Sequence, residues 1–92
     1  MYWRIRNGAA LVWQTWDDEE FLLYDASTGD THLVNRVTRE ALRLLEASPH
    51  RGSDLSHHIA DELHIEHGIE FESSIADLLA HLDRIGLAEP VG

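Results

Sequence analysis

The chain has 92 residues, the size of one small domain, and 43% of them are hydrophobic. Seven arginines and no lysine stand against 17 acidic residues, so the formal net charge is −10. A nucleic-acid-binding protein needs the opposite sign of charge to neutralise phosphates. The absence of cysteine excludes disulfides, thiol catalysis and cysteine-based metal sites, and it fits a reducing cytoplasm.

No apolar run approaches the roughly 18–20 residues that a membrane span requires, and the first residues lack the pattern of a signal peptide. We therefore expect a soluble protein of the cytoplasm. The acidic charge is concentrated late, because nine acids and one arginine lie between Gly52 and Glu89. This charge either serves solubility alone or complements a basic patch on a partner.

The first part of the chain has the period of β-strands. Residues 2–6 alternate apolar and basic side chains, so they form a short strand or an arm packed across a sheet. Residues 10–16 form a strand with Val12, Gln14 and Trp16 on one face. Residues 20–25 have apolar side chains at both odd- and even-numbered positions, which predicts a strand covered on both faces.

Residues 31–34 form the last strand of this group, with Thr31 and Leu33 on one face and His32 and Val34 on the other. The connections between these strands are short and carry charged or glycine-containing turns, which forces an antiparallel meander. The outer edge of the last strand then has no partner within the chain. Such an edge is a row of free N–H and C=O groups.

From Asn35 onward the hydrophobic period becomes 3.6. Asn35 is expected to cap a first helix that stops at Ser48-Pro49. After a loop over residues 50–52, Ser53 is expected to cap a second helix that ends near His64. A third helix starts at about residues 70–73 and ends in a left-handed C-cap at Gly86.

Ile65 and Ile69 flank the turn before the third helix, and we expect both to fill the core. Residues 89–92 are expected to fray. The predicted elements form one α+β domain in residues 1–92, with an arm over residues 1–8, a sheet over 9–35 and helices over 36–88.

The histidines could suggest a metal site, since His64 and His67 can meet on one helical turn. No second pair of ligands lies at a recognisable spacing, and Gly68 interrupts the helix, so we predict no metal and no cofactor. The sequence has no nucleophile elbow, phosphate loop or paired-acid motif, and we expect no enzyme activity. The tryptophans are expected to pack on the sheet, with Trp3 alternatively in an interface.

The third helix has more apolar positions than one core-facing stripe needs, and it can lie beside the last strand. Its apolar residues are Phe71, Ile75, Leu78, Leu79, Leu82 and Ile85. Some of them must fill the core. If the others border a groove next to Leu33, an extended peptide could add a strand along Thr31–Val34.

The order and spacing of several short motifs resemble the PqqD-like peptide chaperones, also called RiPP recognition elements, over about residues 9–89. The motifs are T-W-D-D-E (15–19), F-L-L-Y-D (21–25), the turn S-T-G-D (27–30), T-H-L-V-N (31–35) running into R-V-T-R-E-A-L-R-L-L-E, and the terminal I-G-L-A-E (85–89). The opening W-R-I and the block G-D-T-H-L are most similar to a subgroup found beside an HPr-kinase-like protein.

This resemblance implies a winged-helix-like, non-catalytic adaptor. Such a domain captures the leader segment of a precursor peptide as an added strand and presents it to a modifying enzyme. The implied peptide-binding residues lie on the last strand and the third helix: Thr31, His32, Leu33, Val34, Ile75, Leu79 and Leu82. The L-N that commonly precedes the first helix in this family is Val34-Asn35 here. The sequence therefore defines the first residue of that helix only to within one or two positions.

Two other interpretations stay open at this point. The chain could be a structural subunit that forms a homodimer through its sheet edge or its tryptophans. It could also be a winged-helix DNA-binding domain, in which the third helix would read the groove. Three acids on that helix, Glu72, Asp77 and Asp83, oppose one arginine, Arg84, which counts against DNA binding.

Overall fold

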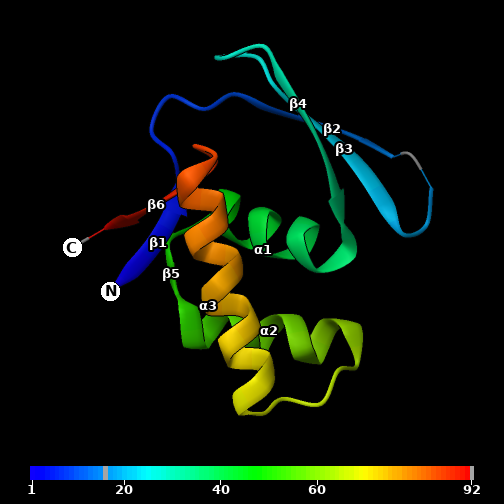
Figure 1. Cartoon of the computed structure of the whole chain (residues 1–92), viewed down its shortest axis with the longest axis vertical. Coiled ribbons are helices and arrows are strands. Elements are labelled where there is room, and N and C mark those ends of the chain that lie inside the picture. Colours follow the sequence, from blue (N-terminus) through cyan, green and yellow to red (C-terminus); the bar gives the residue numbers. More distant parts are fainter. Residues whose placement is uncertain (16, 92) are drawn as a thin grey trace.

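The computed structural model describes residues 1–15 and 17–91 (Figure 1). The elements in chain order are β1 (Tyr2–Ile5), β2 (Leu11–Thr15), β3 (Glu20–Asp25), β4 (Asp30–Asn35), α1 (Arg36–Ala47), β5 (His50–Arg51), α2 (Gly52–Leu63), α3 (Ile69–Arg84) and β6 (Ala88–Val91). A β2-β3-β4 meander followed by three helices confirms the predicted α+β fold. Within the described residues, no helix is both long and apolar enough to cross a membrane.

The meander is antiparallel, with β3 in the centre and β2 and β4 at its sides. Phe21, Leu23 and Asp25 of β3 are buried, whereas Tyr24 on the opposite face is 43% exposed. The expectation that residues 20–25 are covered on both faces is therefore wrong, because the core lies against the Leu23 face alone. Trp16, expected on the face of Val12, lies outside the described residues.

A second sheet, with the strand order β5-β1-β6, was not predicted from the sequence. The antiparallel register of β1 and β6 runs from Tyr2 opposite Val91 to Ile5 opposite Ala88. The arm expected over residues 1–8 thus contains a strand, and the expected fraying is wrong for residues 89–91. Ala88 is buried and fixes the start of β6, and β1 supplies its hydrogen-bonding partners.

The loop expected over residues 50–52 is also wrong, because His50 and Arg51 pair with β1. The extended backbone continues to Arg51, which is the N-cap residue of α2, so Ser53 lies inside the helix and does not cap it. The cap of α1 is as predicted, since Asn35 Oδ1 accepts a 2.9 Å hydrogen bond from the Thr38 amide.

The C-terminal end of α3 confirms the predicted left-handed cap. Gly86 has φ +80°, its N–H donates to the Asp83 carbonyl at 3.2 Å, and the Leu87 N–H donates to the Leu82 carbonyl at 2.9 Å. This pair of bonds is a Schellman motif, which satisfies carbonyls that the helix end leaves free. It also turns the chain so that Leu87 enters the core.

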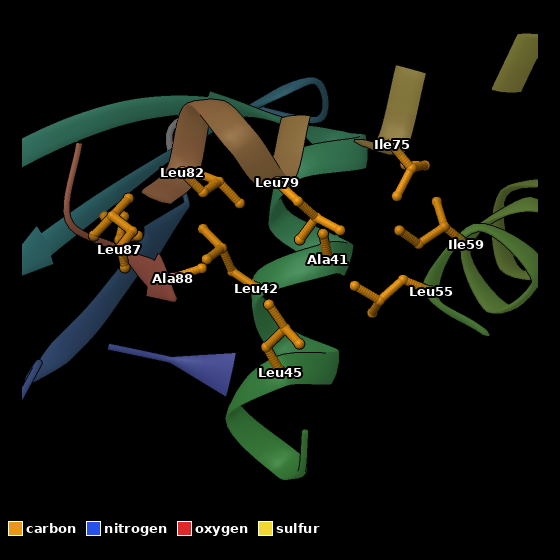
Figure 2. Packing of buried hydrophobic residues seen from close by; sticks show 11 residues of the cluster. Ala41, Leu42, Leu45, Leu55, Ile59, Ile75, Leu79, Leu82, Leu87 and Ala88 are labelled. Carbon is orange, nitrogen blue, oxygen red and sulfur yellow. The ribbon is translucent and has the colours of Figure 1, made fainter. Parts of the chain in front are cut away.

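The core lies between the helices, with contributions from both sheets. Figure 2 shows Ile75 and Leu79 of α3 pointing toward Ala41 of α1 and Leu55 and Ile59 of α2. The other members of the buried cluster are Leu23, Leu42, Leu45, Leu82, Leu87 and Ala88.

Ile69 does not fill the core as expected, because it is 85% exposed. It is the first residue of α3 and lies about 120° around the helix axis from the buried Ile75. Ile65, on the other side of the turn, is half-buried.

A polar cluster joins the two sheets to the end of α3. Asp25 is 1% exposed, and its carboxylate accepts hydrogen bonds from the Ser27 hydroxyl (2.6 Å), the Ser27 amide (2.9 Å) and the Ala10 amide (3.1 Å). Arg6, which follows β1, donates to Asp25 Oδ2 at 3.2 Å and to the Gly86 carbonyl at 2.6 Å. The carboxylate is thus fully satisfied although it is buried.

Candidate functional site

A groove of about 380 Å³ lies between β4 and the C-terminal half of α3. Its strand wall and floor are formed by Thr31, His32, Leu33, Val34, Asn35 and Thr38. Its helix wall is formed by Leu78, His81, Leu82 and Ile85. The groove therefore combines one sheet edge with an apolar helix face.

The backbone of β4 offers hydrogen-bonding groups toward this groove. Among the described residues, β4 pairs with β3 alone. The Ala26 N–H donates to the Ala10 carbonyl, and the Asp17 N–H donates to the Glu20 carbonyl, so the even-numbered residues of β3 point their backbone groups toward β2. In an antiparallel ladder these directions alternate, so the odd-numbered residues of β3 bond to β4.

The register then identifies the free groups of β4. The odd-numbered Leu23 and Phe21 lie opposite His32 and Val34, whose N–H and C=O groups are therefore used within the sheet. The N–H and C=O groups of Thr31 and Leu33 point to the free edge. These two residues can hydrogen-bond a further strand without breaking any bond of the meander.

The side chains of β4 divide between two faces, as the sequence predicted. Val34 is 9% exposed and His32 is half-buried, and both face the helical layer. Leu33 is 55% exposed and Thr31 is exposed, and both lie on the outer face of the sheet. All four residues line the groove.

The predicted helix residues divide differently. Leu82 lines the groove, but its side chain is 1% exposed and belongs mainly to the core. Ile75 and Leu79 are each 1% exposed, point into the core and do not line the groove. Their place in the groove wall is taken by the half-buried Leu78 and by Ile85, which is 38% exposed.

Leu78, His81 and Ile85 were thus not predicted as groove residues from the sequence. Residues 78, 82 and 85 follow a helical spacing of four and three, and so do 75, 79 and 82, so α3 carries two overlapping apolar stripes. The spacing alone shows both stripes and does not say which one faces the core. His81 is the one polar side chain of α3 that lines the groove. Its position in the sequence indicates a groove residue only when the face of α3 that borders the groove is already known.

The groove has no acidic side chain in its lining. Its ionisable members are His32 on β4 and His81 on α3, and Arg84 Nη2 lies 3.5 Å from His81 Nδ1. By contrast, the stretch from Leu11 to Asn35 holds six acids and no arginine or lysine. The groove is therefore a nearly neutral strip beside a strongly acidic sheet.

A second hollow of about 520 Å³ is wide open and lies at the turn between α2 and α3. It is lined by Ile65, Glu66, Gly68, Ile69, Glu70, Phe71 and Ser74. It adjoins no strand edge, and its polar lining includes two carboxylates. We therefore place the candidate functional site at the β4–α3 groove.

One cluster has the residue types of a hydrolase triad but not its geometry. Ser56 Oγ lies 3.1 Å from His67 Nε2, and Glu72 Oε1 lies 3.8 Å from the same nitrogen. In a triad the acid orients the histidine through its other nitrogen. Ser56 is also 0% exposed and donates its hydroxyl proton to the Ser53 carbonyl, so it cannot reach a substrate. The cluster fixes the turn after α2 instead.

Among residues 1–15 and 17–91, no group of three or more histidine, aspartate or glutamate side chains is arranged to hold a metal ion. His64 adopts a left-handed backbone conformation at the end of α2, with φ 56°. The helix thus ends at Leu63, before both His64 and His67, so the two histidines do not share a helical turn.

No protein-family model matches the sequence, and no curated protein matches it significantly. A solved structure described as lasso peptide synthetase B1 complexed with the leader peptide is similar to this chain, with a TM-score of 0.67. The two sequences are 22% identical, and the match covers 96% of this chain and 98% of that one. At this identity the likeness establishes a common fold over nearly the whole length of both chains.

Proposed function

We propose that this chain is a peptide-binding adaptor of the PqqD-like kind. It binds the leader segment of a precursor peptide as an added strand on β4 and holds it against α3. The rest of the precursor is then presented to a peptide-modifying enzyme. The observation that carries this proposal is the free edge of β4, among the described residues, beside a groove whose helix wall is mostly apolar.

The backbone supplies affinity in this proposal. The N–H and C=O groups of Thr31 and Leu33 point away from β3, and a peptide strand can pair with them in either direction. Side chains on one face of that strand enter the groove toward Leu78, Leu82 and Ile85. This division between backbone pairing and side-chain pockets is how strand addition combines affinity with specificity.

The solved structure of similar fold supports this proposal, since that protein is in complex with a leader peptide. Charge supports it as well. The acidic sheet disfavours nucleic acid, because phosphates would meet five exposed acids and no arginine or lysine over residues 11–35. A homodimer joined through β4 is the main competitor, since it would use the same edge.

Amide hydrogen exchange distinguishes these possibilities. The labelled chain is mixed with short peptides encoded beside its gene, and the exchange rates of β4 are followed by NMR. A bound strand slows exchange at Thr31 and Leu33, whereas His32 and Val34, already bonded to β3, change little. If these amides are protected without peptide and become exposed on dilution, the edge joins two copies. If no peptide protects them, the proposal fails.

A pair of variants tests the backbone contribution alone. Thr31→Pro removes an outward N–H that β3 does not use, and an edge strand tolerates such a proline. Thr31→Ala changes the side chain and keeps the N–H. We expect Thr31→Pro to weaken peptide binding by about fivefold to tenfold, the effect of one hydrogen bond, and Thr31→Ala to bind nearly as wild type. Equal binding by both variants would contradict strand addition at this residue.

A further inference from the structure

The outer face of the meander carries large apolar side chains beside its polar ones, where an exposed sheet face is normally polar. Val12 is 54% exposed, Tyr24 43% and Leu33 55%, and Leu22 between them is half-buried. A hollow of about 280 Å³ lies on this face. Within the described residues the helical layer packs on the opposite face, so these side chains have no cover.

The strand register arranges these side chains in rows that lead to the β4 edge. One row contains Gln14, Leu22 and Leu33, and the next contains Val12, Tyr24 and Thr31. Neighbouring side chains in such a row are in contact across the strands. Each row ends at β4, because no further strand follows among the described residues. Leu33 is therefore the exposed end of its row, and its direct neighbour in that row, Leu22, is also apolar.

A strand added to β4 extends both faces of the sheet. The peptide residue directly opposite Leu33 points its side chain to the outer face, because paired residues in a sheet share one face. The residues before and after it point to the other face. Those two side chains enter the groove beside Leu78, Leu82 and Ile85.

From this arrangement we infer that the recognised segment carries three successive apolar residues. The outer two enter the groove, and the middle one packs on Leu33. This inference rests on the proposed strand addition and names the class of peptide that it selects. An ordinary amphipathic strand, with a polar middle residue, would leave Leu33 uncovered.

The acidic residues near Leu33 restrict the class of bound peptide further. On the outer face, Glu20 lies opposite Asn35, next to the Leu22–Leu33 pair along the sheet. Asp17, Asp18 and Glu19 adjoin it in the β2–β3 turn. A carboxylate in the middle position of the peptide would meet like charge and an apolar neighbour. The segment is therefore free of acidic residues at this position.

A display library of random peptides, selected on the immobilised full-length chain, supplies the probes for the test. Selected peptides are synthesised with a fluorescent label, and their affinity is measured by anisotropy. We expect a triplet of apolar residues in the selected sequences. Replacing its middle residue by serine weakens binding about twofold to fivefold, and aspartate weakens it more than tenfold.

A double-mutant cycle assigns the contact to Leu33. In the Leu33→Ser chain, the serine replacement in the peptide has little further effect, because the side chain it contacts is gone. Ile69→Ser, which changes an exposed isoleucine at the α2–α3 turn, is the matched control and leaves the effect intact. The inference is supported if the effect of the middle peptide residue depends on Leu33 and not on Ile69.

The experiment distinguishes failure of this inference from failure of the proposed function. If peptides bind and protect the amides of Thr31 and Leu33, but the middle position accepts serine or aspartate without loss, this inference is wrong and strand addition stands. If the library yields no binder, or its binders leave those amides exchanging freely, the proposed function is wrong, and the inference fails with it.

Discussion

Arg6 and Asp25 connect the two sheets, with 3.2 Å between Arg6 Nη2 and Asp25 Oδ2. The aspartate lies at the end of β3, and the arginine directly follows β1. A buried carboxylate is costly unless hydrogen bonds and an opposite charge satisfy it, and here both are present. The pair therefore holds the meander against the sheet of the chain ends.

The first prediction concerns acid. The hydrogen bond from the Ser27 hydroxyl, together with those from the Ala10 and Ser27 amides and from Arg6, outweighs burial and lowers the pKa of Asp25 from 3.8 to about 2. Because the folded pKa is lowered, the unfolded chain takes up a proton first as the pH falls. The stability from Asp25 is therefore fully present above pH 3.8 and is lost as the pH falls toward about 2.

Urea unfolding as a function of pH measures this effect. We expect Asp25→Asn to lower the free energy of unfolding by about 1–3 kcal/mol near neutral pH, with a difference from wild type that shrinks below pH 4. Asp30→Asn is the matched control, since this exposed aspartate closes the same turn and its side chain makes no hydrogen bond within the described chain. A pH-independent deficit in Asp25→Asn would contradict the linkage.

The second prediction separates two isoleucines of α3. Ile75 is 1% exposed and Ile69 is 85% exposed. Ile75→Ala leaves a cavity and should cost about 2–5 kcal/mol of unfolding free energy, whereas Ile69→Ala should change it by less than about 0.5 kcal/mol. Chemical denaturation followed by circular dichroism gives both values. Similar costs for the two variants would place Ile75 outside the core.

The third prediction concerns two glycines at the ends of α3. Gly86 has φ +80°, a conformation that side chains disfavour, whereas Gly68 has φ −151° at the N-cap. Gly86→Ser should lower the unfolding free energy by about 1 kcal/mol or more. Gly68→Ser should be neutral or stabilising, because serine is a favoured N-cap residue. Thermal unfolding of both variants checks the contrast, and a loss at Gly68 would contradict it.

The fourth prediction concerns β6. A chain that ends after Leu87 lacks the four residues of β6 that pair with β1, including the buried Ala88. We expect the unfolding free energy to fall by about 2–4 kcal/mol, since each lost hydrogen bond contributes about 1 kcal/mol net. Calorimetry of the shortened and full chains measures the difference. An unchanged transition would mean that β6 adds no stability.

The meander and the helices were predictable because their signals are local. The alternation in residues 31–34 separates Leu33 from Val34, and Asn35 marks the start of α1 with its own side chain. The second sheet was not predictable in the same way. β1 and β6 are four residues each and pair across nearly the whole chain, so neither segment shows its partner in its own sequence.

The candidate site was half predictable for a related reason. A strand has two faces, so the exposed Leu33 and the buried Val34 follow from a period of two once one face is assigned. A helix has a continuous circumference, and Leu82 belongs both to the stripe of Ile75 and to that of Leu78. Only the packing against α1 and α2 decides between the stripes.

The pairing of β1 with β6 brings the two ends of the described chain close together, since Tyr2 lies opposite Val91. Figure 1 shows β1 and β6 on one side of α3, and β4 extends on the other side. A second protein fused to either end would therefore be tethered away from β4. Because the two ends lie close together, a short linker can join them, and new ends can be opened in the turn between α2 and α3. Such a circularly permuted chain would keep the meander uncut.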